Sequence, residues 1–261
     1  MSMLTIEDVS KTFTTKRGGD TRRTHALQNI DLVVEEGEFC VIIGASGCGK
    51  STLLRLIDGL IHPSSGVVRI QGEPVTGPGP DRGVVFQHAN LLPWRTVRGN
   101  IEFGLECLGF DKAERRRRSD RYIEMVGLSA FADHYPGQLS GGMQQRVGLA
   151  RAFAVEPQIL LMDEPFGALD AQTRLVMQAE LEKIWELDRR TAVLITHDIE
   201  EAIYLADRVV VMSAHPGRVA EIVPIPFPRP RRDELRGDPE FGRLKSHLWN
   251  ALRAGGGSGD H

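Results

Sequence analysis

The fold is decided by residues 39–51, which read FCVIIGASGCGKS. Residues 39–43 are continuously apolar, as expected of a short strand that is buried on both faces of a sheet. Residues 44–51 match the pattern GxxxxGK[ST] at every fixed position, and a helical pattern over residues 50–60 follows. A strand, a glycine-rich loop and a helix in this order predict a phosphate-binding loop within an α/β fold.

The residues of this loop suit an anion. Glycines allow the backbone to curl so that successive N–H groups point inward, and the start of the helix adds its positive dipole end. Lys50 would supply a mobile positive charge and catalytic assistance at the outer phosphates, and the Ser51 hydroxyl could ligate Mg²⁺. The alternative is a plain glycine-rich turn, which the complete motif in its strand–loop–helix frame disfavours. We interpret Cys48 as a spacer. The predicted nucleotide-binding residues are Gly44, Ala45, Ser46, Gly47, Cys48, Gly49, Lys50, Ser51 and Thr52.

A second motif, ILLMDE at residues 159–164, is an apolar strand that ends in two acids. Such a strand would deliver Asp163 to the carboxyl edge of a sheet, where α/β folds place their ligands. Asp163 could hold Mg²⁺ through water, and Glu164 could polarise an attacking water. Two solvated acids at a strand end are the alternative, which is weaker in a chain that also carries a phosphate loop.

Composition limits the class of protein. The 261 residues suffice for one large domain or a core with an inserted subdomain, and 41% apolar with 26% charged residues is typical of a folded chain. The net charge of −3 argues against nucleic acid as a partner. The three cysteines, Cys40, Cys48 and Cys107, form no CxxC pair and indicate neither disulfides nor zinc. We see no signal peptide and no apolar run of membrane-spanning length, and therefore expect a cytoplasmic protein that reaches membranes through a partner.

Further strands and helices alternate along the chain, which predicts a largely parallel sheet. The expected strands are residues 67–70, 83–86, 159–162, 192–195 and 209–212, and the expected helices between them include 171–187 and 198–206. Residues 27–34 alternate apolar and polar side chains, as in a half-exposed antiparallel sheet.

Between residues 87 and 158 the pattern becomes helical, with helices expected at 96–108, 112–125 and 140–155. We interpret about 88–157 as a helical subdomain inserted in an ATPase-type domain of residues 1–230. The arginine run at 115–118 is interpreted as a solvated helix face. Residues 231–261 are expected to form a helix near 240–252 and a frayed tail, after a proline-rich extended connector.

The segment LSGGMQQR at residues 139–146 resembles the signature of the ABC ATPase family, commonly written LSGGQ. Ser140 can cap the following helix, and Gly141 and Gly142 expose amides at its positive end. Met143 replaces the usual glutamine and leaves the Ser-Gly-Gly core intact. The resemblance implies a RecA-like P-loop NTPase core with an N-terminal antiparallel β subdomain and an inserted helical subdomain. It also implies that this site addresses the γ-phosphate of ATP held by a second copy, in a head-to-tail dimer.

Other positions follow the family's order over residues 9–214. The resemblance implies that Phe13 stacks on adenine, although Phe13 could equally belong to the core. It implies that Gln87 senses the γ-phosphate and Mg²⁺, that the loop 167–170 with Asp170 crosses the dimer interface, and that His197 contacts the γ-phosphate. Catalytic roles are expected for Glu164, His197, Gln87 and Lys50.

Residues 77–106, with GPGPDRG and LLPW, look like the ATPases of bacterial importers for nitrate, sulfonates and taurine. The resemblance implies a permease that docks near Leu91, Leu92 and Trp94 at the cytoplasmic face of the plasma membrane, and a separate solute-binding protein. These apolar residues could instead pack the subdomain's own core. Pyrimidine precursors and other small solutes stay open. The alternatives to transport are a soluble ABC ATPase of repair, translation or cluster assembly, and a regulatory module that binds ATP without hydrolysis.

Overall fold

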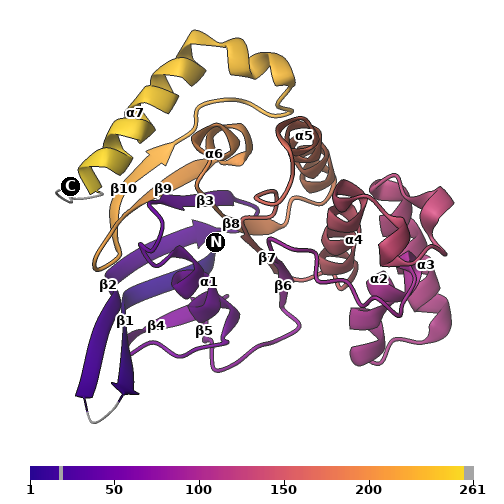
Figure 1. The fold of residues 1–261 in the computed structure, drawn as a ribbon, viewed down its shortest axis with the longest axis horizontal. Helices are drawn as coiled ribbons and strands as arrows, with labels where there is room; N and C mark the ends of the chain where they lie inside the picture. Colours follow the sequence, from indigo (N-terminus) through magenta and orange to yellow (C-terminus); the bar gives the residue numbers. More distant parts are fainter. Residues whose placement is uncertain (18–19, 256–261) are drawn as a thin grey trace. The chain divides into compact units, whose positions relative to one another are not determined.

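The computed structural model describes residues 1–17 and 20–255, and the chain divides into two compact units (Figure 1). The first unit combines Met1–Gly79 with Thr191–His261, and the second is Pro80–Arg190. The fold is of the predicted α/β class, with an N-terminal antiparallel sheet and a group of helices between the two main sequence motifs.

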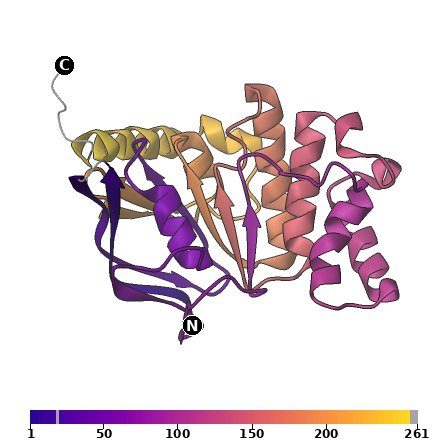
Figure 2. The same cartoon turned by 60° about the horizontal axis from the view of Figure 1, so that its bottom comes forward.

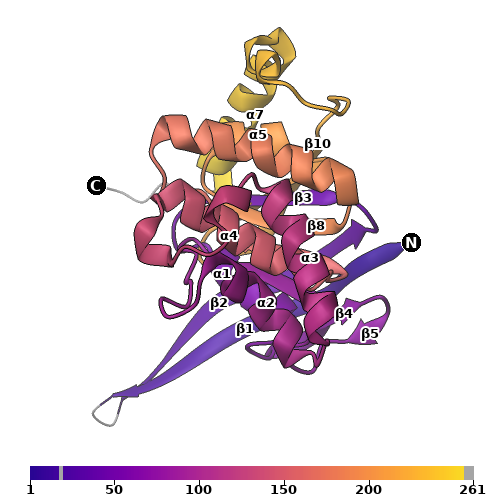
Figure 3. The ribbon, with the colours of Figure 1, turned by 90° about the vertical axis from the view of Figure 1, so that its right-hand side faces the viewer.

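The first unit contains an antiparallel sheet in the strand order β2-β1-β4-β5. Its strands are β1 (Ser2–Arg17), β2 (Asp20–Glu35), β4 (Ser65–Ile70) and β5 (Glu73–Pro74). Strands β1 and β2 form a long hairpin that continues past the residues of β1 that pair with β4 (Figure 3). Along β2 the side chains of Ile30, Leu32 and Val34 are buried, and the residues between them are exposed, which confirms the predicted half-exposed strand.

One predicted strand was assigned to the wrong sheet. We expected residues 67–70 in a parallel sheet that is buried on both faces, but β4 pairs antiparallel with β1 and β5. Val68 and Ile70 are buried, whereas Arg69 between them is half-exposed. The segment therefore alternates like an antiparallel strand with one solvated face, and its high content of β-branched residues concealed that pattern.

The same unit contains the strand that precedes the phosphate loop. Strand β3 (Phe39–Gly44) runs parallel to both β8 (Thr191–Thr196) and β9 (Arg208–Ser213), and β10 (Arg218–Pro224) pairs antiparallel with β9. Every residue of β3 and β8 is buried, as the apolar runs predicted. Helix α1 (Lys50–Asp58) contacts β2, β3 and β8, and so lies between the two sheets of this unit (Figure 2).

The second unit joins a parallel strand pair to a group of helices. Strands β6 (Arg82–Val85) and β7 (Ile159–Asp163) pair in parallel. The three predicted helices are confirmed to within a residue at each end, and each packs against the other two. They are α2 (Val97–Cys107), α3 (Lys112–Met125) and α4 (Gly141–Ala154). Short 3₁₀ turns at Ser129–Phe131 and Pro136–Gln138 separate α3 from α4, and α5 (Ala171–Asp188) follows β7.

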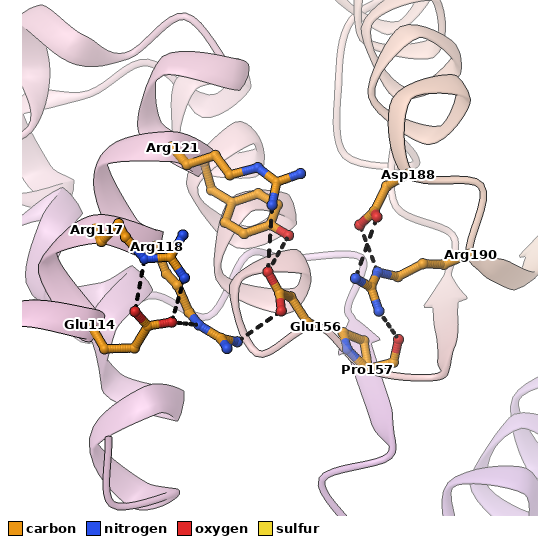
Figure 4. Close-up of polar contacts among 9 residues, drawn as sticks. Glu114, Arg117, Arg118, Arg121, Glu156, Pro157, Asp188 and Arg190 are labelled. Atoms are coloured by element: carbon orange, nitrogen blue, oxygen red, sulfur yellow. Dashed lines mark hydrogen bonds and ion pairs between the residues drawn. The ribbon is translucent and has the colours of Figure 1, made fainter. Parts of the chain in front are cut away.

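The arginine run of α3 is only partly a solvated face. Arg116 and Arg117 are exposed, but the side chain of Arg118 keeps only 15% of its exposure. Its Nε donates to Glu114 at 2.6 Å and its Nη1 lies 3.0 Å from Glu156, just beyond the end of α4 (Figure 4). The run therefore also ties α3 to α4. The charge run alone predicted a solvated face because it took no account of Glu114 and Glu156, which pair with Arg118.

The C-terminal segment is fastened to the first unit. After β10 the chain passes through the proline-rich stretch, a 3₁₀ turn (Asp233–Gly237) and α7 (Pro239–Gly255), which confirms the predicted terminal helix. Arg231 is 5% exposed and donates to the carbonyls of Ile203 and Tyr204 in α6 (Ile199–Leu205). The expected frayed tail, residues 256–261, lies outside the described residues. Across residues 1–17 and 20–255, none of the helices combines the length and apolar character that a membrane crossing requires.

Candidate nucleotide site

The phosphate loop follows β3 directly and ends in α1. Lys50 is the first residue of α1, and its buried side chain turns back over the loop. The Nζ atom donates to the carbonyl of Gly44 at 2.7 Å and to that of Ala45 at 3.2 Å. The ammonium group therefore lies at the inner side of the loop, where a phosphate oxygen could replace a carbonyl as its acceptor.

Two glycines of the loop adopt backbone conformations that other residues avoid. Gly47 has φ of 79° and Gly49, the N-cap of α1, has φ of 102°. Gly44 is constrained by space instead, because a Cβ atom there would lie 2.5 Å from Cys48 Sγ. The spacer interpretation of Cys48 agrees with its burial, and Ala45, Ser46 and Gly47 remain exposed. Exposed loop backbone above a buried lysine is the arrangement that binds a polyphosphate.

Two further predicted residues belong to this unit. His197 is exposed and immediately follows β8, between Thr196 and Asp198, the N-cap of α6. Phe13 lies on β1 with 40% of its surface exposed, and Lys11 Nζ lies 5.2 Å from the centre of its ring. The alternative that Phe13 belongs to the core is wrong, and its exposed ring can stack on a base.

Two residues near His197, Thr196 and Glu201, belong to no sequence motif but hold its backbone in place. Glu201 is 3% exposed, and its carboxylate accepts a hydrogen bond from the buried Thr196 hydroxyl. That hydroxyl oxygen also accepts from the N–H of Asp198 at 3.0 Å. The two side chains therefore hold the backbone on both sides of His197. Their spacing around the histidine could have suggested this role.

In the second unit, Gln87 and Glu164 converge on Gly167. A Cβ atom on Gly167 would lie 2.9 Å from Gln87 Nε2 and 3.4 Å from Glu164 Oε2. Glu164 has φ of 45°, and its carbonyl accepts a hydrogen bond from the N–H of Gly167 at 3.0 Å. Left-handed backbone at a non-glycine residue is uncommon and concentrates at functional sites. Asp163, at the end of β7, immediately precedes this turn.

Two helix starts lie side by side in the same unit. Ser140 caps α4, and its Oγ accepts a hydrogen bond from the N–H of Met143 at 3.3 Å. Asp170 caps α5 by accepting from the N–H of Thr173 at 3.0 Å. Hydrogen bonding to Thr173 lowers the pKa of Asp170. A Cβ atom on Gly142 would lie 2.9 Å from Thr173 Cγ2, which shows how closely the starts of the two helices pack.

The segment LLPW contributes one large exposed apolar side chain, that of Trp94. Trp94 is 71% exposed, whereas Leu91 and Leu92 are half-buried. The alternative that these residues simply fill the core is therefore wrong for Trp94. Leu91 helps to line a surface cavity of about 410 Å³, together with Gln87, Pro136, Gln144 and Leu169.

Asn100 shapes this segment and was also missed. It is fully buried on α2, and its Oδ1 accepts from the N–H of Leu92 at 2.8 Å. Its Nδ2 donates to the carbonyls of Leu92, Arg95 and Thr96 at 3.0–3.1 Å. One amide thus closes the loop from Leu92 to Thr96. A polar residue at an otherwise apolar helix position was the available signal.

Each of the two units contains an oxygen group of the kind that binds Mg²⁺ together with phosphate. Within the described parts of the chain, no three histidine, cysteine or acidic side chains gather closely enough to hold a metal alone. Mg²⁺ is usually bound by one or two protein oxygens together with phosphate oxygens and water. The Ser51 hydroxyl at the start of α1 and the Asp163 carboxylate at the end of β7 are groups of that kind.

Comparisons with known proteins agree with these features. The family described as ABC transporter matches residues 27–167. The nitrate import ATP-binding protein of Synechocystis is 46% identical over 256 residues, covering 96% of this chain and 95% of that protein. The bicarbonate transport ATP-binding protein of the same organism is 48% identical over 255 residues, covering 96% and 89%.

A solved structure supports the fold and the chemistry. It is a dimeric, post-hydrolysis ATP-binding cassette bound to ADP and Pi, with a TM-score of 0.72 and 36% identity. The match covers 86% of this chain and all of that one. With its phosphate loop, its glutamate turn and its LSGG helix start in family order, the chain belongs to the ABC transporter family, as one of the ATP-binding subunits that hydrolyse ATP.

Proposed function

We propose that this chain energises the import of a small solute through a partner permease. The observation that carries the proposal is the match, over 96% of the chain, to ATP-binding proteins named for nitrate import and bicarbonate transport. Both names describe small oxyanions. Nitrate, an aliphatic sulfonate and taurine remain our candidate solutes, and bicarbonate joins them.

The residues of the first unit would bind the nucleotide. Lys50 and the loop amides would hold the β- and γ-phosphates, because the ammonium group already lies at the inner side of the loop. The exposed ring of Phe13 would stack on adenine. His197, held from both sides by Thr196 and its partners, would contact the γ-phosphate and position the attacking water.

The residues of the second unit would carry out the hydrolysis. Glu164 would act as general base, and Gln87, whose amide also lies against Gly167, would sense the γ-phosphate and the metal. Gln87 and Asp163 would hold Mg²⁺ together with Ser51 of the first unit, and the ion neutralises charge on the phosphates when it is bound. In the closed dimer, Ser140, Gly141 and Gly142 would present the start of α4 to the nucleotide of the partner copy, with Asp170 at the interface.

Two copies of this chain and a permease would form the complete transporter. The dimeric cassette with ADP and Pi supports a dimer, and the importer names support a permease at the cytoplasmic face of a bacterial plasma membrane. The exposed Trp94, with Leu91 and Leu92, would receive that permease beside the 410 Å³ cavity. Within the chain, we propose an ATPase domain of residues 1–230 with a helical subdomain at about 88–157, followed by residues 231–261 as a C-terminal extension.

The catalytic assignment is tested by Glu164→Gln. The amide cannot accept a proton, so turnover should fall by at least about 100-fold while ATP still binds and the dimer accumulates. Phosphate release and size-exclusion chromatography with ATP measure the two effects. Glu124→Gln, at an exposed position of α3, is the matched control and should hydrolyse normally. Turnover near the wild-type rate in Glu164→Gln would remove the role given to this glutamate.

The transport assignment is tested by co-expression with the neighbouring genes. We expect a permease to co-purify in detergent with the wild-type chain, and Trp94→Ala to weaken that association while the basal ATPase rate is retained. A homodimer that never captures a permease would favour a soluble ABC ATPase instead. Binding of ATP without phosphate release would favour the regulatory module.

A further inference from the structure

The turn between β9 and β10, residues 214–217 with the sequence AHPG, packs against the phosphate loop although no nucleotide-binding motif includes it. Gly217 is buried, and its N–H donates to the carbonyl of Ala26 at 3.0 Å. Its own carbonyl accepts from the N–H of Gln28 at 2.9 Å. These two bonds fasten the turn to β2 on both sides of Leu27.

Gly217 leaves no room for a side chain. A Cβ atom there would lie 2.0 Å from the carbonyl oxygen of Cys48, 3.0 Å from Leu27 Cδ2 and 3.1 Å from the carbonyl oxygen of Ala26. The shortest of these approaches is to backbone, which cannot rotate away as the end of a side chain can. Any side chain at this position must therefore displace the phosphate loop, or the turn must leave its place.

Gly49, within the phosphate loop, also packs against Leu27 and the carbonyl of Ala26. A Cβ atom on Gly49 would lie 2.6 Å from Leu27 Cδ2 and 2.9 Å from the carbonyl oxygen of Ala26. Leu27 is 1% exposed and thus has little freedom to move. The Cys48–Gly49 backbone consequently rests against β2 and against Gly217. This contact supports the left-handed conformation of Gly49, the residue directly before the start of α1 at Lys50.

The turn is also held at its other end. The N–H of Ala214 donates to the carbonyl of Gly255, the last residue of α7, at 3.1 Å. Arg218, directly after the turn, donates to the side chain of Gln28 at 2.6 Å. The turn is therefore a small fixed body, anchored on one side to β2 and on the other to the C-terminal helix.

We propose that the 214–217 turn is a positioning element of the nucleotide site, in which Gly217 fixes the carbonyl of Cys48 and so the direction of the loop amides. Gly217 touches no phosphate and acts only through the loop. The inference rests on the proposed role of residues 44–52. It assigns to the β9–β10 turn a part of the affinity for the triphosphate.

The test is Gly217→Ala in the full chain. Because an added Cβ atom at residue 217 must displace the backbone of the phosphate loop, we expect KM for ATP and Kd for a fluorescent ATP analogue to rise by roughly tenfold or more. The thermal shift caused by ATP should shrink correspondingly. Gly237→Ala and Gly242→Ala are matched controls, because a Cβ atom at either position meets nothing within 4 Å. Both should keep the wild-type KM.

KM separates positioning from a purely structural role. A variant that only loses folded protein would show a lower apparent kcat with an unchanged KM, and that result would overturn the proposal. If Gly217→Ala does not fold, Leu27→Val is the second variant, because it shortens the side chain that packs against Gly49 and Gly217 and adds no atom. It should raise KM in the same direction by a smaller factor, and an unchanged KM there would also overturn the proposal.

Lys50→Ala, measured in the same assays, separates the positioning role of Gly217 from the phosphate-binding role of the loop itself. Loss of binding in Lys50→Ala with normal binding in Gly217→Ala would refute the positioning role alone. Normal binding in Lys50→Ala would refute the phosphate loop itself.

Discussion

For single residues, the nucleotide site depends on a few buried or strained groups. Lys50 is 7% exposed and is satisfied by two carbonyls of the loop that it closes. Glu164 has a left-handed backbone, and its carboxylate and the Gln87 amide both lie close to Gly167. Such positions are disfavoured locally and are retained when surrounding structure and function require them.

Lys50→Ala should therefore weaken ATP binding more than it weakens the fold. One charge-assisted interaction is worth about 1.5–3 kcal/mol, which corresponds to roughly a 10- to 100-fold higher Kd. Equilibrium binding of a fluorescent ATP analogue measures the change. Lys183→Ala, at a lysine with 71% exposure, is the control and should bind normally. Equal affinities for both variants would contradict the assignment of Lys50.

For helices, the stability of α3 depends in part on ion pairs between its own side chains. The pKa of Glu114 falls from its ordinary 4.5 to about 2 because Arg117 and Arg118 donate hydrogen bonds to its carboxylate. A depressed pKa means that ionised Glu114 stabilises the folded state above pH 4.5. That contribution is lost as the pH falls through the interval from about 4.5 to about 2.

Glu114→Gln should accordingly lower the melting temperature at neutral pH, and the difference from wild type should shrink as the pH falls below 4.5. Thermal unfolding at a series of pH values measures the difference. Glu124→Gln, at an exposed position on the same helix, is the control for the loss of one carboxylate. A Glu114→Gln difference that stays constant down to pH 2 would show that the ion pairs contribute nothing through ionisation.

For the whole molecule, the C-terminal segment is part of the folded first unit. Arg231 donates to the carbonyls of Ile203, Tyr204 and Phe227, and Tyr204 returns a hydrogen bond to the Arg231 carbonyl. Arg229 adds a bond to Asp207 at 3.0 Å. The proline-rich stretch thus joins α6, which begins just after His197, to the terminal helix.

Arg231→Ala should destabilise the protein by about 3 kcal/mol, because it leaves several buried carbonyls without their donor. Urea unfolding of the full chain measures the loss. Arg253→Ala, at an exposed position of α7, should change the free energy of unfolding by less than about 0.5 kcal/mol. An Arg231→Ala value within that same range would mean that the connector is only loosely attached.

Much of the fold was accessible from the residue pattern. The helices at 96–108, 112–125 and 140–155 were placed to within a residue, because Thr96, Asp111 and Ser140 cap them through contacts three residues away. The strands around residues 39–43 and 192–195 were found because burial on both faces leaves continuous apolar runs. Residues 67–70 were placed in the wrong sheet, since a short β-branched segment carries no information about its pairing partner.

The sequence by itself determined the phosphate loop, the acids that end β7 and the LSGG helix start, because each depends on neighbours within a few residues along the chain. Only the tertiary structure decided what Gly217 does. Its partner is brought to it by folding, as Cys48 is brought to Gly217 by the parallel pairing of β3 with β9. A contact between residues far apart in the chain leaves no local pattern, and its consequence appears only where the backbones meet.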